Sequence, residues 1–225
     1  WADLEAAGIT LKEACGNTVR NVTASPTAGI DPDELFDVSP YAHAFYDYFL
    51  RNPICQEMGR KFKAAFSSSD KDTGYTFMHD LGFIPRILDG KKGFKVVIGG
   101  GLGSQPVIAE VAHEFLAVKE LIPYSEAVIR VFDRYGERAS RGKARMKFLI
   151  KKIGLEEMVK LIEEEKTAII NKSYDIDESA AQLAIPADRT EFPNEEAIDN
   201  VLYEKWRASN VFEQKQKDFF GITIK

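Results

Sequence analysis

Several stretches of the chain alternate between apolar and polar residues or are rich in β-branched residues, and both patterns are typical of strands. In residues 60–67, Phe62, Ala64 and Phe66 fall on one side, whereas Lys61 and Lys63 fall on the other. This pattern predicts a half-buried strand with two cations on its polar face. The predicted strands are 18–24, 60–67, 79–88 and 93–99, with a turn at Asp89-Gly90 between the last two.

Other stretches repeat their apolar residues at the spacing of an amphipathic helix. Met146, Leu149, Ile150 and Ile153 lie on one face of such a helix, with lysines between them. Helices are predicted at 39–50, 106–118, 123–135, 143–153, 155–170 and 195–220, and a short helix or turn at 3–15. Because a run of strands precedes a run of helices, we expect an α+β fold, with a mixed β-sheet of about four to five strands covered by helices.

Composition places the chain among globular proteins and shows an uneven distribution of charge. Of its 225 residues, 44% are hydrophobic and 29% are charged, which is ordinary for a folded domain. The formal net charge is −5, yet residues 134–152 hold eight basic residues and one acidic residue. Residues 171–225 carry −4 of that net charge. A basic run is usually a solvated helix face, and the alternative is a site for a polyanionic ligand.

Most motifs for catalysis, metal binding or membrane insertion are absent from the sequence. The glycine run at 99–103 is followed by Ser104 where a dinucleotide-binding loop needs glycine, so close approach of two backbones is the simpler explanation. The three histidines lack metal-ligand spacing, and Cys15 and Cys55 cannot form a disulfide scaffold or a four-thiolate site. No long apolar segment or amino-terminal signal pattern occurs, so we expect a cytoplasmic protein without a membrane partner.

The remaining candidate chemistry is cationic. Arg20 lies in one predicted strand, and Arg60, Lys61 and Lys63 open another, although strands favour apolar and aromatic residues. If these cations converge, they form an anion pocket in which guanidinium groups hold carboxylates and ammonium groups serve a small oxyanion. If they do not, they face water on one side of a sheet, and composition alone leaves both possibilities open. A nucleic-acid site in 134–152 is a weaker possibility, because interleaved exposed aromatic residues are missing there.

Five stretches carry a further signal when they are taken together and in order. They are VRNVTASPTAGIDPDELFD (19–37), GRKFKAAFS (59–67), HDLGF (79–83), KGFKVVIGGGLGSQP (92–106) and EAVIRVFDRYGERASRGKARMKFLI (126–150). They resemble the sulfite/nitrite reductase family of sirohaem and 4Fe–4S enzymes, from about residue 1 to about residue 170. The RNVT and GKARMKFLI segments are the most specific, and the glycine run is the least specific by itself.

The resemblance implies an enzyme that reduces sulfite to sulfide or nitrite to ammonia with six electrons. It also implies sirohaem and a 4Fe–4S cluster as cofactors, a ferredoxin as the usual electron donor, and a fold like that of the nitrite/sulfite reductase 4Fe–4S domain. Matched position by position, the residues expected to contact the substrate anion in catalysis are Arg20, Lys61 and Lys63. Those expected to bind the sirohaem carboxylates are Arg60 and Arg145, and those expected beside the macrocycle are Asn21 and Thr23.

One departure from the family pattern concerns the cluster. The family holds it with four cysteines in two closely spaced pairs, and Cys15 and Cys55 lie outside such pairs. We therefore expect the cluster ligands to be absent from this chain, and the chain to be an inactive piece of a longer reductase. Residues 1–170 are expected to form a sirohaem-binding module, and 171–225 a linker and the start of the next, ferredoxin-like half.

The expected partners are sulfite or nitrite, an electron donor such as ferredoxin, and the remainder of the reductase polypeptide. No nucleic-acid partner is expected. The alternative function is a non-catalytic module that binds an anion or a tetrapyrrole. Sulfite and nitrite are not distinguished by the sequence, because both are small anions that lose oxygen and the same cations serve both.

Overall fold

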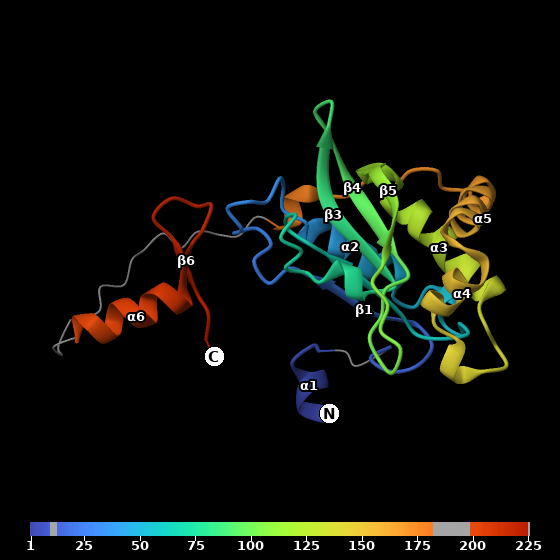
Figure 1. The fold of residues 1–225 in the computed structure, drawn as a ribbon, viewed down its shortest axis with the longest axis horizontal. Coiled ribbons are helices and arrows are strands. Elements are labelled where there is room, and N and C mark those ends of the chain that lie inside the picture. The colour runs from blue at the N-terminus through green and yellow to red at the C-terminus, as the bar shows by residue number, and fades with distance from the viewer. Residues whose placement is uncertain (10–12, 182–198, 225) are drawn as a thin grey trace.

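A five-stranded mixed β-sheet organises the molecule (Figure 1). The computed structural model describes residues 1–9, 13–181 and 199–224. The strands, in their order across the sheet, are β1 (Val19–Ala24), β2 (Phe62–Phe66), β3 (Leu81–Leu88), β4 (Lys91–Ile98) and β5 (Glu110–Ala117). β1, β2 and β3 run parallel, whereas β4 pairs antiparallel with β3, and β5 with β4. The first three strands therefore begin at one edge of the sheet, and β4 ends at that edge.

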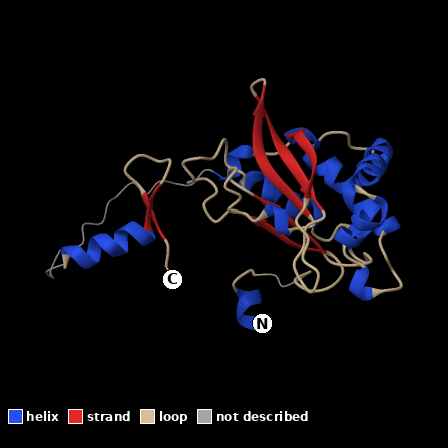
Figure 2. Ribbon diagram, viewed as in Figure 1, coloured by secondary structure: helices blue, strands red, loops and turns tan. Residues whose placement is uncertain are grey.

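Helices pack around the sheet, so the predicted α+β arrangement is confirmed (Figure 2). The longer helices are α2 (Ser39–Phe49), α3 (Leu121–Tyr135), α4 (Met146–Ile153) and α5 (Leu155–Ala168). A small C-terminal unit consists of α6 (Asn200–Asn210) and a hairpin of β6 (Val211–Glu213) and β7 (Phe220–Ile222). The short helices are α1 (Ala2–Ala6) and 3₁₀ segments at Pro53–Cys55, Thr76–Met78, Val118–Glu120, Arg141–Lys143 and Glu178–Ala181.

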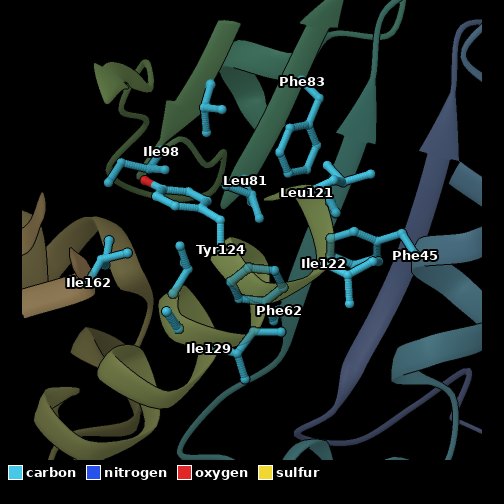
Figure 3. Close-up of a cluster of buried hydrophobic side chains, with 14 of the residues drawn as sticks. Phe45, Phe62, Leu81, Phe83, Ile98, Leu121, Ile122, Tyr124, Ile129 and Ile162 are labelled. Atoms are coloured by element: carbon cyan, nitrogen blue, oxygen red, sulfur yellow. The ribbon is translucent and has the colours of Figure 1, made fainter. Parts of the chain in front are cut away.

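The hydrophobic core lies between the sheet and the helices α2, α3 and α5 (Figure 3). Phe66 of β2 stacks on Phe83 of β3 with ring centroids 4.7 Å apart. Phe45 of α2 packs edge-on against Phe66, and Phe94 of β4 packs edge-on against Phe83. All four rings are fully buried, and this aromatic cluster joins three strands to a helix.

Two local predictions are confirmed in detail. The β3–β4 hairpin turns at Asp89 and Gly90, whose φ angles of 50° and 73° are the left-handed values that a type I′ turn requires. In β2, Phe62, Ala64 and Phe66 are buried on the core side, as the alternation predicts. The lysines between and before them are only half-buried, because they lie on the opposite face.

The helix predicted at 106–118 is wrong, because this segment contains β5. The pairing of β5 with β4 shifts register between Phe94 and Val96, and again between Val96 and Val97. Such irregularities interrupt the alternation of buried and exposed positions by which a strand is identified in a sequence. The unpaired edge of β4 supplies the hydrogen bonds that decide the conformation of this segment, and that edge exists only in the folded sheet.

Predictions for the two ends of the chain are met in part. At the N-terminus, where a short helix or turn is predicted at 3–15, α1 is followed by a turn at 7–8, and residues 10–12 lie outside the described residues. At the C-terminus, a hairpin follows α6 where one helix is predicted at 195–220, and residues 195–198 lie outside the described part. Within the described ranges, no helix has the length and apolar character that crossing a membrane requires.

The C-terminal segments contact the main body at several places, including Tyr174, whose ring packs edge-on against Tyr48. The Tyr41 hydroxyl of α2 donates to the Glu178 carboxylate at 2.6 Å. In the β6–β7 turn, the Lys215 N–H donates to the Ile30 carbonyl at 3.0 Å, and the Gln216 side-chain amide donates to the Gly29 carbonyl at 2.7 Å. Part of the segment expected to be a linker therefore packs on the module before it.

We expect Phe83→Ala to lower the free energy of unfolding by about 3–5 kcal/mol, because the buried ring leaves a cavity beside Phe66 and Phe94. Ile87 lies in the same strand but is 49% exposed, so Ile87→Ala should cost about 0.5 kcal/mol or less. Urea unfolding followed by circular dichroism measures both values. Equal losses would show that the aromatic cluster does not dominate the packing.

Candidate functional site

Charged residues lie at the edge of the sheet where the parallel strands begin, which we call the strand-start edge. Asp80 immediately precedes β3, Lys63 lies near the start of β2, and Arg145 immediately precedes α4. The Lys63 backbone N–H donates to the Asp80 carboxylate at 3.0 Å, and the Gly99 N–H donates to the Asp80 carbonyl at 2.9 Å. These bonds join β2, β3 and the end of β4 at this edge.

Arg145 and Asp80 form a buried ion pair with several hydrogen bonds. The Arg145 Nε and Nη2 atoms donate to Oδ1 at 3.2 and 2.9 Å, and Nη2 also donates to Oδ2 at 2.7 Å. The Asp80 side chain is 0% exposed and the Arg145 side chain 15% exposed. Burial raises the pKa of Asp80, while Arg145 and the Lys63 N–H act to lower it. The carboxylate provides a counter-charge within the site and fixes the direction of the Arg145 guanidinium.

The other cations at this edge lie close enough to repel one another. Burial and neighbouring cations lower the pKa of both Lys61 and Arg60. The further cations that contribute are Arg20, Lys63, Arg141 and Arg145. The Arg60 Nε atom is buried and has no hydrogen-bond partner among the described residues. The edge thus holds more positive charge than Asp80 balances, and an arriving anion would relieve this repulsion.

The residues that the sequence singles out on β1 lie beside those of β2. The β1–β2 register shifts between Val19 and Asn21, so Arg20 occupies a bulge at the start of β1. Asn21 pairs with Lys63, and Thr23 lies two positions further along the same strand. Because cross-strand neighbours share a face, Asn21 and Thr23 lie on the polar face of the sheet with Lys63. The convergence of cations is found, and the individual roles expected of them stay predictions.

Two buried charged residues of this edge are not identified by the sequence pattern. Asp80 is separated from Arg145 by 65 positions, so no local spacing reveals the pair. Lys147 lies between Met146 and Phe148 at the start of α4, where it is 5% exposed. A lysine flanked by apolar residues in a helix is the one available signal, and it also fits a lysine on the surface.

The glycine run after β4 is explained by close packing of backbones, as the sequence predicts. A Cβ atom on Gly100 would lie 2.3 Å from the Phe77 carbonyl oxygen, so only glycine fits there. Gly99 has a φ of 86°, a left-handed value that glycine adopts without strain.

The cysteines do not form a metal site with other described residues. Cys15 is exposed and Cys55 is buried, and burial raises the pKa of the Cys55 thiol to about 12. Across the described ranges, no group of three or more histidine, cysteine, aspartate or glutamate side chains is arranged to hold a metal ion. Two cysteines also fall short of the four thiolates that a 4Fe–4S cluster needs.

Comparison with known proteins decides the family. The model of a family described as "Nitrite and sulphite reductase 4Fe-4S domain" matches residues 15–169. The chain belongs to this family. A sulfite reductase (ferredoxin) 1 of Mycolicibacterium paratuberculosis is 34% identical over 166 residues, which are 73% of this chain and 30% of that protein. A ferredoxin–nitrite reductase of Leptolyngbya laminosa is 30% identical over 166 residues, with coverage of 72% and 32%.

Solved structures agree with this family membership. The NirA protein of Mycobacterium tuberculosis matches with a TM-score of 0.67 and 31% identity, over 75% of this chain and 31% of NirA. A dissimilatory sulfite reductase I matches with a TM-score of 0.52 and 11% identity, which shows similarity of fold alone. The expected family and fold are therefore confirmed. The chain spans about a third of the length of its curated relatives.

We expect Arg145→Met to lower the free energy of unfolding by about 3–5 kcal/mol, because Asp80 then stays buried without its charged partner. The double variant Asp80→Asn/Arg145→Met should lose less than the sum of the two single losses. Arg207 pairs with Glu204 on the surface of α6, so Arg207→Met should cost about 0.5 kcal/mol or less. Urea unfolding tests the cycle, and additive losses for Asp80 and Arg145 would contradict a coupled pair.

Lys61 should oppose folding near neutral pH. Its lowered pKa means that, between this value and the ordinary 10.5, the unfolded chain binds more protons, so the contribution of Lys61 to stability rises with pH there. Below this window, the charged side chain is repelled by its neighbours in the fold. Lys61→Gln should therefore raise the Tm at pH 7, and the gain should shrink between about 0.05 M and about 0.5 M salt.

A matched control for this measurement is Lys160→Gln on the exposed side of α5, where the lysine side chain is 63% exposed. Its Tm should stay close to that of the wild type at both salt concentrations. A Tm for Lys61→Gln below the wild-type value would contradict the repulsion.

Proposed function

We propose that this chain forms the part of a sulfite or nitrite reductase that binds sirohaem and the substrate anion, in a six-electron reduction. The main support is the excess of cations at the strand-start edge, where the Arg60 Nε is buried without a partner in the described residues. A buried donor of this kind costs free energy unless a ligand accepts its hydrogen bond. A tetrapyrrole that carries several carboxylates offers both the acceptors and the negative charge.

We assign the cofactor-facing roles as the family resemblance suggests. Arg60 has a donor to offer to a cofactor carboxylate. Arg145 uses Nε and Nη2 for Asp80, which leaves its Nη1 for a carboxylate and holds the group in one direction. Asn21 and Thr23, on the polar face of β1, are assigned beside the macrocycle. When bound, sirohaem supplies the iron that ligates the substrate and passes electrons to it.

We assign Arg20, Lys61 and Lys63 to the substrate anion. Arg20 and Lys63 both contribute positive charge at Lys61, as the lowered pKa of Lys61 indicates. A lowered pKa also makes the Lys61 ammonium group a better proton donor near neutral pH. Because the oxygen atoms of sulfite or nitrite leave as water, protons are needed at those atoms, and Lys61 is the group proposed to hold one there.

The rest of the reaction depends in this proposal on a longer polypeptide. The family description names a 4Fe-4S cluster, and its ligands would come from outside this chain, which has two cysteines. Residues 1–170 then form the sirohaem-binding module and 171–225 lead into the next half. The names of both relatives include ferredoxin, which is the electron donor we propose. The chain by itself is expected to bind sirohaem without turnover.

Titration of sirohaem into the purified chain, followed by absorption spectroscopy, tests the proposal. We expect saturable binding, and Arg60→Gln should weaken it about tenfold, because it removes a charge-assisted contact. Lys61→Gln should weaken sirohaem binding less, because Lys61 is assigned to the substrate anion. Lys160→Gln is the matched control and should bind as the wild type does. Arg145→Met is unsuitable as a probe of binding alone, because it also removes the partner of Asp80.

Two outcomes would count against the proposal. A folded wild-type chain that binds no sirohaem would contradict the cofactor assignment. Equal affinities of the wild type and Arg60→Gln would show that sirohaem binds away from the strand-start edge. Turnover of sulfite or nitrite by the isolated chain with a reduced donor would contradict the division of roles between this chain and the cluster.

A further inference from the structure

Lys147 holds the loop that follows β4. Its Nζ atom donates to the carbonyl groups of Gly101 at 3.3 Å and Leu102 at 3.2 Å, and also to the carbonyl group of Gln105. Lys147 is 5% exposed. Its pKa is lowered, mainly because the side chain is buried and also because the charge of Arg145 is near. Three backbone carbonyl groups thus take the place of water around a buried ammonium group, which ties the loop to the start of α4.

The direction of these carbonyl groups determines where the next amides point. No cis peptide bond occurs in the structure, and in a trans peptide the N–H points opposite to the carbonyl of the same peptide unit. Since the Gly101 and Leu102 carbonyls point at Lys147, the N–H groups of Leu102 and Gly103 point away from it. Neither N–H donates to another described residue. Gly103 has a φ of 111°, which side chains disfavour, so glycine suits this loop.

Positive charge surrounds this loop. Gln105 lines a hollow of about 390 Å³ together with Lys143, Lys151 and Lys152, and Glu137 is the one acidic residue among the described residues of that lining. Within the described residues, none of these three ammonium groups forms a salt bridge. On the side toward the strand-start edge, a Cβ atom on Gly101 would lie 3.6 Å from the Arg145 Nη2. Two adjacent free amides among such cations are suited to an oxyanion.

We infer that Lys147 is a positioning residue that turns the Leu102 and Gly103 amides outward as a pair of donors for a carboxylate of the ligand. Lys147 acts through the loop and does not itself touch that carboxylate. The inference rests on the proposed function in taking the carboxylate to belong to sirohaem. A substrate oxyanion has similar chemistry, so the experiment below separates the two sources.

Solution NMR of the ¹⁵N-labelled full chain tests this with sodium citrate as the carboxylate probe, at constant ionic strength. We expect saturable shifts of the Leu102 and Gly103 amide resonances, and no shift of the Gly90 amide in the β3–β4 turn. Lys147→Met keeps most of the apolar part of the side chain and removes the ammonium group, and it should weaken citrate binding about tenfold. Lys160→Met on exposed α5 should leave it unchanged.

The citrate titration of the wild-type chain tests the inference even if Lys147→Met does not fold. Absence of citrate shifts at Leu102 and Gly103 overturns the inference. Shifts caused by sodium sulfite or sodium nitrite but not by citrate overturn the carboxylate assignment, and so does an unchanged citrate affinity in folded Lys147→Met. Citrate shifts without sirohaem binding would support the loop inference while the proposed function fails. Sirohaem binding without citrate shifts would support the proposed function while the loop inference fails.

Discussion

The buried ion pair of Asp80 and Arg145 is the interaction on which the arrangement of the site depends. The Asp80 residue binds the backbone of β2 through its carboxylate and the end of β4 through its carbonyl. Arg145 brings the start of α4 to the same point. Since a buried carboxylate is costly without its partner, the pair resists separation, and it holds segments distant in sequence at one edge of the sheet.

Around this pair, the chain gathers positive charge that does not favour its own folding. Arg60 and Lys61 have lowered pKa values because they are partly buried next to other cations, and the Arg60 Nε lacks a partner in the described residues. Such repulsion is reasonable where an anion is to be bound, because the field is in place before the ligand arrives. Lys147 follows a related principle, since backbone carbonyl groups rather than a carboxylate surround its charge. Its positive charge therefore still adds to the field at the site.

Membership of the nitrite and sulphite reductase family gives meaning to two features of composition. The net charge of −5 suggests little affinity for anions, yet −4 of it comes from residues 171–225, which supply none of the cations of the strand-start edge. The chain has two cysteines and covers about a third of the length of the relatives, whereas a 4Fe–4S cluster needs four thiolates. The cations of the strand-start edge, in contrast, all belong to this chain and lie near one another.

The sequence by itself determined the parts of the structure that depend on neighbouring residues. Asp89-Gly90 specifies the β3–β4 turn because its left-handed backbone matches the twist of the two strands. The alternation of Phe62, Ala64 and Phe66 specifies which face of β2 is buried, and the order of strands and helices indicates the α+β class. The family and the cationic residues were also recognisable from their motifs.

Only the tertiary structure decided the features that depend on distant partners. β5 forms where a helix is predicted, because the edge of β4 offers hydrogen bonds to this segment. The local sequence of 106–118 gives no sign of that partner. Asp80 meets Arg145 across 65 positions, and Lys147 meets the loop at 101–105 across more than 40. Local sequence patterns indicate whether a segment prefers helix or strand and which of its faces is buried. The charge balance of a site, in contrast, arises from side chains that folding brings together.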